Sequence, residues 1–279
     1  CRFLDSRLVS SITKRGHEIL IQSKNFIEDA GYQVIYGDTD SVFVLLGSVP
    51  DDQVNVIGEG LTTQLNAWWT NRLREKYDIS SFLELEFETH FSKFLMPTVR
   101  GSDAGSKKRY AGLVVDNSNP KKSHLLFKGL ESVRSDWSPL AREFQKELYR
   151  RVFFGEPYED YIKLTVQQLT DGKYESELVL RKRLRRKLKD YIKNVPPHAQ
   201  AARKAEDIRR QLELPSLYQS GGWIEYIMTI NGAEPRQYRE SAIDFEFYIE
   251  RQLAPIADAI LAFKSSSMDK ILNNQIGLF

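Results

Sequence analysis

Two carboxylates lie in a short polar stretch between two apolar runs. Residues 37–41 read Gly-Asp-Thr-Asp-Ser and separate the apolar runs 32–36 and 42–46. This pattern predicts a β-hairpin with Asp38 and Asp40 at its tip, and Gly37 is expected to permit the sharp backbone path. Mg²⁺ prefers oxygen ligands, often one or two carboxylates with substrate phosphates, so the tip could serve phosphoryl transfer. A solvated turn is the alternative, because these residue types are common in turns.

Three further acids alternate with apolar residues. Glu84, Glu86 and Glu88 flank Leu85 and Phe87 in the alternating stretch 82–95, which predicts a strand. In a strand the three carboxylates would share one face. Glu86 is therefore a candidate metal ligand, and a solvated strand face is the alternative.

Two basic segments follow. Residues 105–112 read Gly-Ser-Lys-Lys-Arg-Tyr-Ala-Gly, and residues 128–136 read Lys-Gly-Leu-Glu-Ser-Val-Arg-Ser-Asp. Cations beside an aromatic residue can contact phosphates and a base edge together, whereas an exposed basic turn is the alternative. Glu131 and Asp136 are expected to orient neighbouring cations. The candidate DNA-binding residues here are Lys107, Lys108, Arg109, Tyr110, Lys128 and Arg134.

The strongest concentration of charge lies in residues 181–189. Every residue there except Leu184 and Leu188 is Lys or Arg, and Leu180 continues the spacing of four. This spacing predicts a helix over residues 184–192 that buries its leucines and exposes its cations. Such a face suits a polyanion, and a solvated surface is the alternative. Further DNA-binding candidates are Arg181, Arg183, Arg185 and Arg186.

The remaining pattern predicts an α+β protein. Helices precede strands in the first half, and the spacing becomes mostly helical near residues 136–139, where a boundary between two modules is expected. Predicted helices cover residues 6–30, 51–77, 138–153, 157–169, 197–212 and 244–263, the last with Pro255 inside it. Predicted strands cover residues 109–115, 125–128 and 223–230, with a turn at 116–120.

Composition excludes several protein classes. Apolar residues make up 41% of the 279 residues, and the net charge is only +2. One cysteine excludes an intrachain disulfide, and the dispersed histidines have no zinc-site spacing. Charges interrupt every apolar run, so no membrane partner is expected. The chain opens on Cys1 without a secretory signal, so a fragment of a cytoplasmic protein is expected.

Four strings together resemble family B DNA polymerases, especially bacterial members. They are Tyr-Gly-Asp-Thr-Asp-Ser at 36–41, Lys-Lys-Arg-Tyr-Ala-Gly at 107–112, the string at 128–136, and Gln-Ile-Gly-Leu-Phe at 275–279. The resemblance implies a partial palm, an antiparallel sheet with packed helices, over residues 1–136 and a mainly helical thumb over 137–274. It implies that Asp40 binds metal, that Asp38 is a nearby acid, and that Lys108 and Tyr110 hold the primer 3′ end. The segment around Arg203 and Lys204 continues it.

The tail resembles the peptide by which bacterial polymerases bind the sliding clamp. The resemblance implies clamp contacts from Gln275, Ile276, Leu278 and Phe279. A tail that folds back onto the thumb is the alternative.

The resemblance implies template-directed extension of a primer 3′ end with dNTPs, using two Mg²⁺ ions in the full-length enzyme. A second essential aspartate and the nucleotide-binding motif of the family do not occur in this chain. The chain alone is therefore expected to bind primer–template DNA, to bind Mg²⁺ weakly and to be inactive. A nucleoid-associated cytoplasmic location follows. A non-catalytic DNA-binding module with an inert hairpin is one alternative. A metal-dependent nuclease is another, but it gives no reason for a primer-gripping motif.

Overall fold

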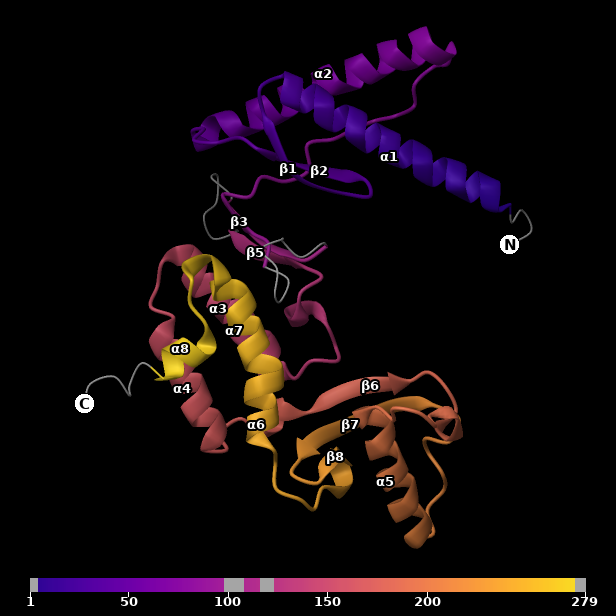
Figure 1. The fold of residues 1–279 in the computed structure, drawn as a ribbon, viewed down its shortest axis with the longest axis vertical. Helices are drawn as coiled ribbons and strands as arrows, with labels where there is room; N and C mark the ends of the chain where they lie inside the picture. The colour runs from indigo at the N-terminus through magenta and orange to yellow at the C-terminus, as the bar shows by residue number, and fades with distance from the viewer. Residues whose placement is uncertain (1–4, 98–107, 116–122, 274–279) are drawn as a thin grey trace. The chain divides into compact units, whose positions relative to one another are not determined.

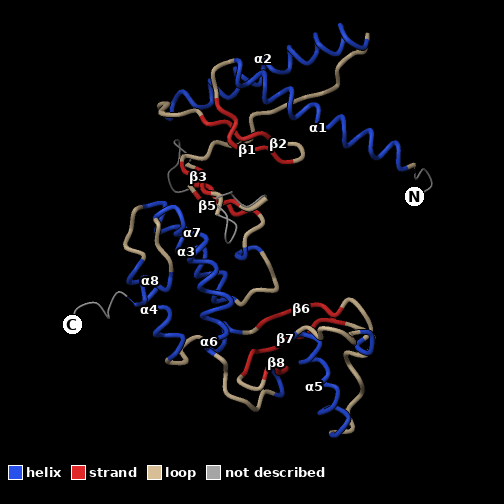
Figure 2. Tube along the Cα trace, in the orientation of Figure 1, coloured by secondary structure: helices blue, strands red, loops and turns tan. Residues whose placement is uncertain are grey.

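The computed structural model describes residues 5–97, 108–115 and 123–273 (Figure 1). The chain divides into two compact units, Cys1–Ser92 with Leu113–His124 and Lys93–Gly112 with Leu125–Phe279. Helices alternate with small sheets in both (Figure 2), which confirms the predicted α+β class. The predicted domain boundary at residue 136 stays a prediction. None of the helices in the described ranges is long and apolar enough to cross a bilayer.

The first unit consists of a hairpin and two long helices. Helix α1 spans Ser6–Asp29, strands β1 and β2 span Gln33–Asp38 and Ser41–Leu45, and helix α2 spans Asp51–Tyr77. Asp5 caps α1 by accepting a 2.8 Å hydrogen bond from the Arg7 backbone N–H, which satisfies a donor that the first turn leaves free. The predicted helices and the hairpin are confirmed.

The core of this unit lies where α1, α2 and the hairpin meet. Ile27 of α1 packs with Leu65 and Trp69 of α2, and hydrophobic residues of both strands pack against them. The Trp69 indole N–H donates to the buried Ser23 hydroxyl at 3.0 Å. This bond satisfies both polar groups and fixes α1 against α2.

The strand predicted over residues 82–95 is wrong except for its end. Only β3, Lys93–Leu95, is a strand, although Leu83 and Leu85 face the core while Glu84, Glu86 and Glu88 are exposed. The backbone of Leu85 is bound by a side chain instead, because the Asn66 amide accepts from its N–H at 2.9 Å and donates to its C=O at 2.8 Å. The alternation of apolar and polar residues therefore predicts correctly that Leu83 and Leu85 face the core, but not that this segment lacks a partner strand in the described part of the chain.

Most of a three-stranded sheet and two helices belong to the second unit. The sheet has the order β3-β4-β5, with β4 at Tyr110–Val114 and β5 at His124–Lys128. Helices α3 and α4 span Pro139–Phe154 and Glu159–Thr170. These elements agree with the predicted strands and helices. The turn predicted at 116–120 lies outside the described residues.

The predicted closing helix over residues 244–263 is interrupted. Helix α6 spans Phe245–Tyr248, a π-helical turn covers Ile249–Leu253, and α7 spans Ala254–Leu261. Pro255 lies in the first turn of α7, where its missing N–H costs little, and the wide turn precedes it. Gln252 in this turn is buried and accepts a 2.5 Å hydrogen bond from the Ser138 hydroxyl, at the start of α3. The last described helix, α8, spans Met268–Asn273.

A second sheet carries the start of the basic run. The helix predicted over residues 184–192 is wrong, because Leu184 ends a strand and only Leu188–Asp190 beyond it forms a short 3₁₀ turn. Leu180–Leu184 forms strand β6, paired with β7 at Gly222–Thr229, which pairs with β8 at Gly232–Pro235. Helix α5, Pro197–Gln211, contacts all three strands. Leu180 and Leu184 are buried as predicted, but residues four apart also share a face of a strand. The spacing therefore could not distinguish the two structures.

Candidate active site and nucleic-acid interface

The β1–β2 hairpin places two carboxylates at its tip. Asp38 pairs with Ser41 at the end of the ladder, so Thr39 and Asp40 form the turn between them. The Thr39 hydroxyl donates to Asp38 Oδ1 at 3.0 Å, and the Ser41 hydroxyl donates to Asp40 Oδ1 at 3.2 Å. Each neighbouring hydroxyl thus orients one carboxylate, and Asp40 is exposed.

The backbone strain of this turn lies at Thr39 and not at Gly37. Thr39 has φ 53°, in the left-handed region that a β-branched residue rarely adopts. Gly37 instead pairs with Val42, and a Cβ added to it would lie 3.4 Å from Leu20 Cδ2 of α1. The role predicted for Gly37 is therefore wrong: it lies in the strand, in close contact with a helix. Strain held at a turn is a feature of functional sites.

The two carboxylates at the hairpin tip could supply part of the ligand set of one Mg²⁺ ion. Two oriented carboxylates are the number that Mg²⁺ usually takes from a protein when phosphates supply further ligands. Across the described part of the chain, no three His, Cys, Asp or Glu side chains are grouped to hold a metal ion. Glu86 therefore does not join Asp38 and Asp40 in a three-ligand cluster here, and its role as a ligand stays a prediction.

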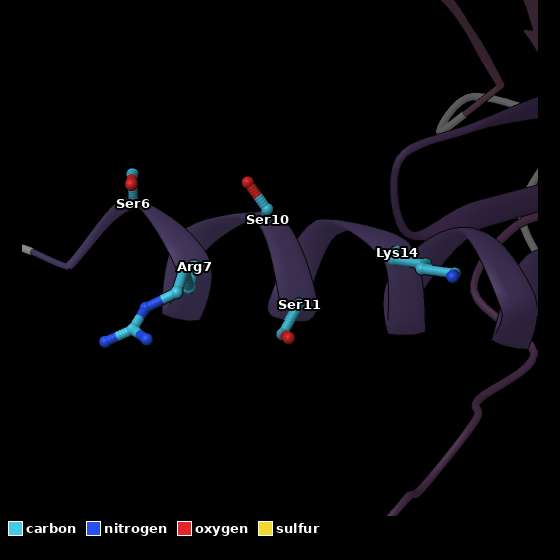
Figure 3. Close-up of a pocket in the computed structure, with 5 residues that line it drawn as sticks. All are labelled: Ser6, Arg7, Ser10, Ser11 and Lys14. Atoms are coloured by element: carbon cyan, nitrogen blue, oxygen red, sulfur yellow. The ribbon is translucent and has the colours of Figure 1, made fainter.

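A shallow depression on α1 makes no comparable site. Figure 3 shows the side chains that line it, all from the first turns of one helix: Ser6, Arg7, Ser10, Ser11 and Lys14. All five are exposed, and Arg7 is held by Asp5 at 2.9 Å. Exposed hydroxyls and a paired arginine offer little to a ligand.

In the second unit, strand β4 begins at the aromatic residue of the basic segment. The Tyr110 ring lies 5.2 Å from that of Phe94, and Lys108 before it is exposed with φ 62°. Arg109 donates to the buried carboxylate of Glu131, which also accepts a 2.7 Å hydrogen bond from the Gln145 amide of α3. Lys107 lies outside the described residues.

Glu131 thus orients Arg109, whereas no hydrogen bond joins it to Lys128 or Arg134 among the described residues. A buried carboxylate that lost Arg109 would be left without its charged partner, which is costly. Through Glu131, Arg109 therefore links the start of β4 to Gln145 of α3. Burial raises the pKa of Tyr149, which lies close enough to Glu131 for its charge to add to this effect.

Gly129 packs directly on this segment, and we expect Gly129→Ala to destabilise the chain by about 1–3 kcal/mol through steric overlap. A Cβ on Gly129, φ 62°, would overlap the carbonyl oxygen of Lys108. The matched control is Gly155→Ala, because Gly155 has φ 70° and open space where its Cβ would stand. Urea unfolding measures both. Equal losses would mean that backbone strain alone matters and that the contact with Lys108 contributes nothing.

Asp136 holds two cations of the same unit. It accepts from Arg134 at 3.0 and 2.9 Å and from Lys182 at 3.3 Å. The hydrogen bonds from Arg134 lower the pKa of Asp136, so this carboxylate stays ionised at neutral pH. The structure thus places Asp136 on Arg134 as the sequence predicts.

The exposed face of the second sheet carries arginines. Arg181 and Arg183 alternate outward along β6, and Arg185 and Arg186 follow in the loop; all four are exposed. Among the described residues, no ion pair joins Arg183, Arg185 or Arg186 to an acid. Lys128, at the end of β5, is exposed as well. These positive charges are available to a polyanion.

A family model described as DNA polymerase family B matches residues 2–273. The chain belongs to DNA polymerase family B. It is 50% identical over 280 residues to DNA polymerase II of Escherichia coli (strain K12), and this match covers 100% of the chain. It is 26% identical to the DNA polymerase alpha catalytic subunit of Drosophila melanogaster, over 91% of the chain and 17% of that protein.

The fold agrees with a solved family B structure. The family B DNA polymerase from the hyperthermophilic archaeon Pyrobaculum calidifontis matches with a TM-score of 0.56 and 23% identity, over 93% of this chain and 30% of that one. The chain spans only 35% of the Escherichia coli relative. It therefore spans about a third of these two relatives and less of the Drosophila melanogaster protein.

Two features of this family B chain differ from what the sequence indicates. Arg203 and Lys204, in the segment that continues the family resemblance, bind neighbouring backbone: Arg203 donates to the Tyr191 carbonyl at 2.5 Å and Lys204 to the Asn231 carbonyl at 3.0 Å. Sequence reasoning also missed Trp223, which is 48% exposed beside Arg181. No local signal marked it, because its contact with Arg181 comes from the pairing of β6 with β7. The candidates Gln275, Ile276, Leu278 and Phe279 lie outside the described residues.

Proposed function

We propose that the chain is the palm and thumb portion of a DNA-directed DNA polymerase that extends a primer 3′ end with dNTPs by two-metal phosphoryl transfer. Residues 1–136 form the carboxyl-terminal part of the palm, and residues 137–274 form the thumb. The observation that supports this most is the pair of oriented carboxylates at the strained tip of the hairpin in a family B chain.

In this proposal Asp40 and Asp38 hold Mg²⁺, with Glu86 as a further candidate. When bound, Mg²⁺ supplies electrostatic stabilisation of the charge that develops on the transferring phosphate. Thr39 and Ser41 keep the two carboxylates oriented before substrate arrives, which reduces the reorganisation needed at reaction. The strands below the tip limit its movement.

Residues of the second unit hold the DNA. Lys107, Lys108 and Tyr110 contact the primer end, and Arg109 keeps this segment in place through Glu131. Lys128, Arg134, Arg181, Arg183, Arg185 and Arg186 contact backbone phosphates. Such contacts position DNA without reading its sequence, as a polymerase that copies every template requires.

The chain by itself binds primer–template DNA but does not catalyse. A second aspartate and the family's nucleotide-binding motif are absent from its 279 residues, so Mg²⁺ binding is weak and the dNTP site is incomplete. The complete polymerase works on the nucleoid in the cytoplasm. Its tail, Gln275, Ile276, Leu278 and Phe279, binds the bacterial sliding clamp.

Primer extension by the complete polymerase tests both assignments. We expect Mg²⁺-dependent extension that the clamp stimulates, and we expect loss of that stimulation when residues 275–279 are deleted, because apolar side chains and an oriented amide form a short linear anchor. Extension without the clamp should be unchanged by the deletion. Degradation of the primer without dNTP incorporation would reject the polymerase function, and full stimulation of the truncated enzyme would reject the clamp site alone.

A further inference from the structure

A basic groove lies at one end of the β6–β7 sheet. It has a volume of about 610 Å³ and is lined by Arg183, Leu184, Arg185, Ser220, Gly222 and Trp223. No acid from the described part of the chain lines it, and both arginines are exposed. A Cβ on Gly222 would meet no atom within 4 Å, so the groove is open at this residue.

Trp223 lies at this groove with much of its large side chain exposed to solvent. The residue directly across the ladder is Arg183, and the Arg181 guanidinium lies 4.8 Å from the indole centroid. A cation over the ring restrains it by a cation–π contact. The indole nevertheless keeps 48% of its surface exposed, whereas Ile224 beside it in the strand is fully buried against the α5 side.

The acid nearest to Trp223 in the strand, Glu225, already forms an ion pair with another arginine. Glu225, which pairs with Arg181 in the ladder, accepts from Arg236 at 3.0 Å. The sheet therefore presents an exposed aromatic ring between unneutralised arginines. An aromatic surface next to cations is the combination that binds single-stranded nucleic acid, because a base stacks on the ring while the arginines contact phosphates.

We propose that this groove binds an unpaired nucleotide of single-stranded DNA, with the base stacked on Trp223 and the flanking phosphates on Arg183 and Arg185. A duplex would offer the arginines its phosphates but no open base face to the indole. The site extends the duplex contacts proposed above and does not depend on catalysis. The groove would hold an unpaired stretch of the DNA next to the duplex that the basic residues contact.

The test is DNA binding by the whole 279-residue chain, followed by fluorescence anisotropy. The ligands are a labelled 12-nucleotide oligo(dT), the same oligonucleotide with abasic sites, and a blunt duplex. The variants are Trp223→Ala and Trp223→Phe, with thermal unfolding to check that each folds. Phe263→Ala is the matched control, because Phe263 is also an exposed ring beside a cation, Lys264, but lies outside the groove.

We expect Trp223→Ala to weaken oligo(dT) binding by about 5- to 150-fold, the range of stacking on one aromatic residue. Trp223→Phe should stay within about 3-fold of the unaltered chain, since a phenyl ring still stacks. Phe263→Ala should stay within the same range, because Phe263 lies outside the groove. The abasic oligonucleotide should bind weakly and equally to all variants. Equal losses with Ala and Phe would overturn the stacking site, and so would abasic DNA that bound the unaltered chain as tightly as oligo(dT). An equal loss of duplex binding would also overturn it, and would leave the duplex proposal intact.

Discussion

Replacing Asp40 with asparagine in the complete polymerase is expected to lower nucleotide incorporation by about 100-fold or more, the loss typical when a group that stabilises transition-state charge is removed. The amide keeps the size of the side chain but removes its negative charge, so metal binding at the hairpin tip is lost. Single-turnover primer extension at saturating dNTP measures the change.

The same variant should bind primer–template with unchanged affinity, because the proposed DNA contacts lie on other residues. Asp29→Asn is the matched control: Asp29 is an exposed acid at the end of α1, and its loss should leave incorporation within about 2-fold. Retained incorporation by the Asp40 variant would reject the catalytic role. A parallel loss of DNA binding would mean that the substitution disrupts the fold or the interface.

The chain's affinity for duplex DNA is expected to fall steeply with salt. If the six cations proposed to contact backbone phosphates each bind one phosphate, the affinity should drop by about 1,800-fold between 50 and 200 mM salt, from a slope of about −0.9 per contact. Anisotropy titrations of a labelled duplex at several salt concentrations measure this slope. An affinity indifferent to salt would contradict backbone contact.

Single arginine variants locate the contacts. Arg186→Ala should reduce the magnitude of the slope by about 0.9, whereas Arg150→Ala, the matched control, should not change it. Arg150 belongs to the same unit, but Glu147 and Glu156 already hold its guanidinium at 2.7 and 2.5 Å. If both variants changed the slope equally, binding would depend on net charge and not on the basic sheet.

Local patterns predicted the hairpin and most helices. The acidic turn and the flanking β-branched residues act within a few residues, so the sequence shows them directly. The π-helical turn before Pro255 was predicted only in part: the proline is visible in the sequence, but the wide turn at Ile249–Leu253 is not.

The two wrong elements share a physical cause. In residues 82–95 and 180–192 the pattern predicts most of the buried side chains, but not which groups pair with the backbone. Asn66 binds Leu85 from 19 positions away, and β6 pairs with β7 about forty positions later. Both partners are set by tertiary packing, which overrides local propensity.

The same reason explains which parts of the candidate site could be predicted from the sequence. Asp38, Asp40 and the basic segments were predictable because their chemistry is local. The distinction between cations held by an acid, such as Arg109 and Arg134, and cations without an ion pair among the described residues, such as Arg183, needed the fold. Trp223 acquires interest only once Arg181 lies against it.

The bond between Ser138 and Gln252 joins residues 114 positions apart. It cannot form until the whole intervening stretch, including the basic sheet and α5, has been gathered into a closed loop, and closing so long a loop costs entropy before any contact repays it. Domains dominated by such distant contacts fold slowly. The second unit should therefore complete its folding late, when the last helices of the chain reach the start of α3.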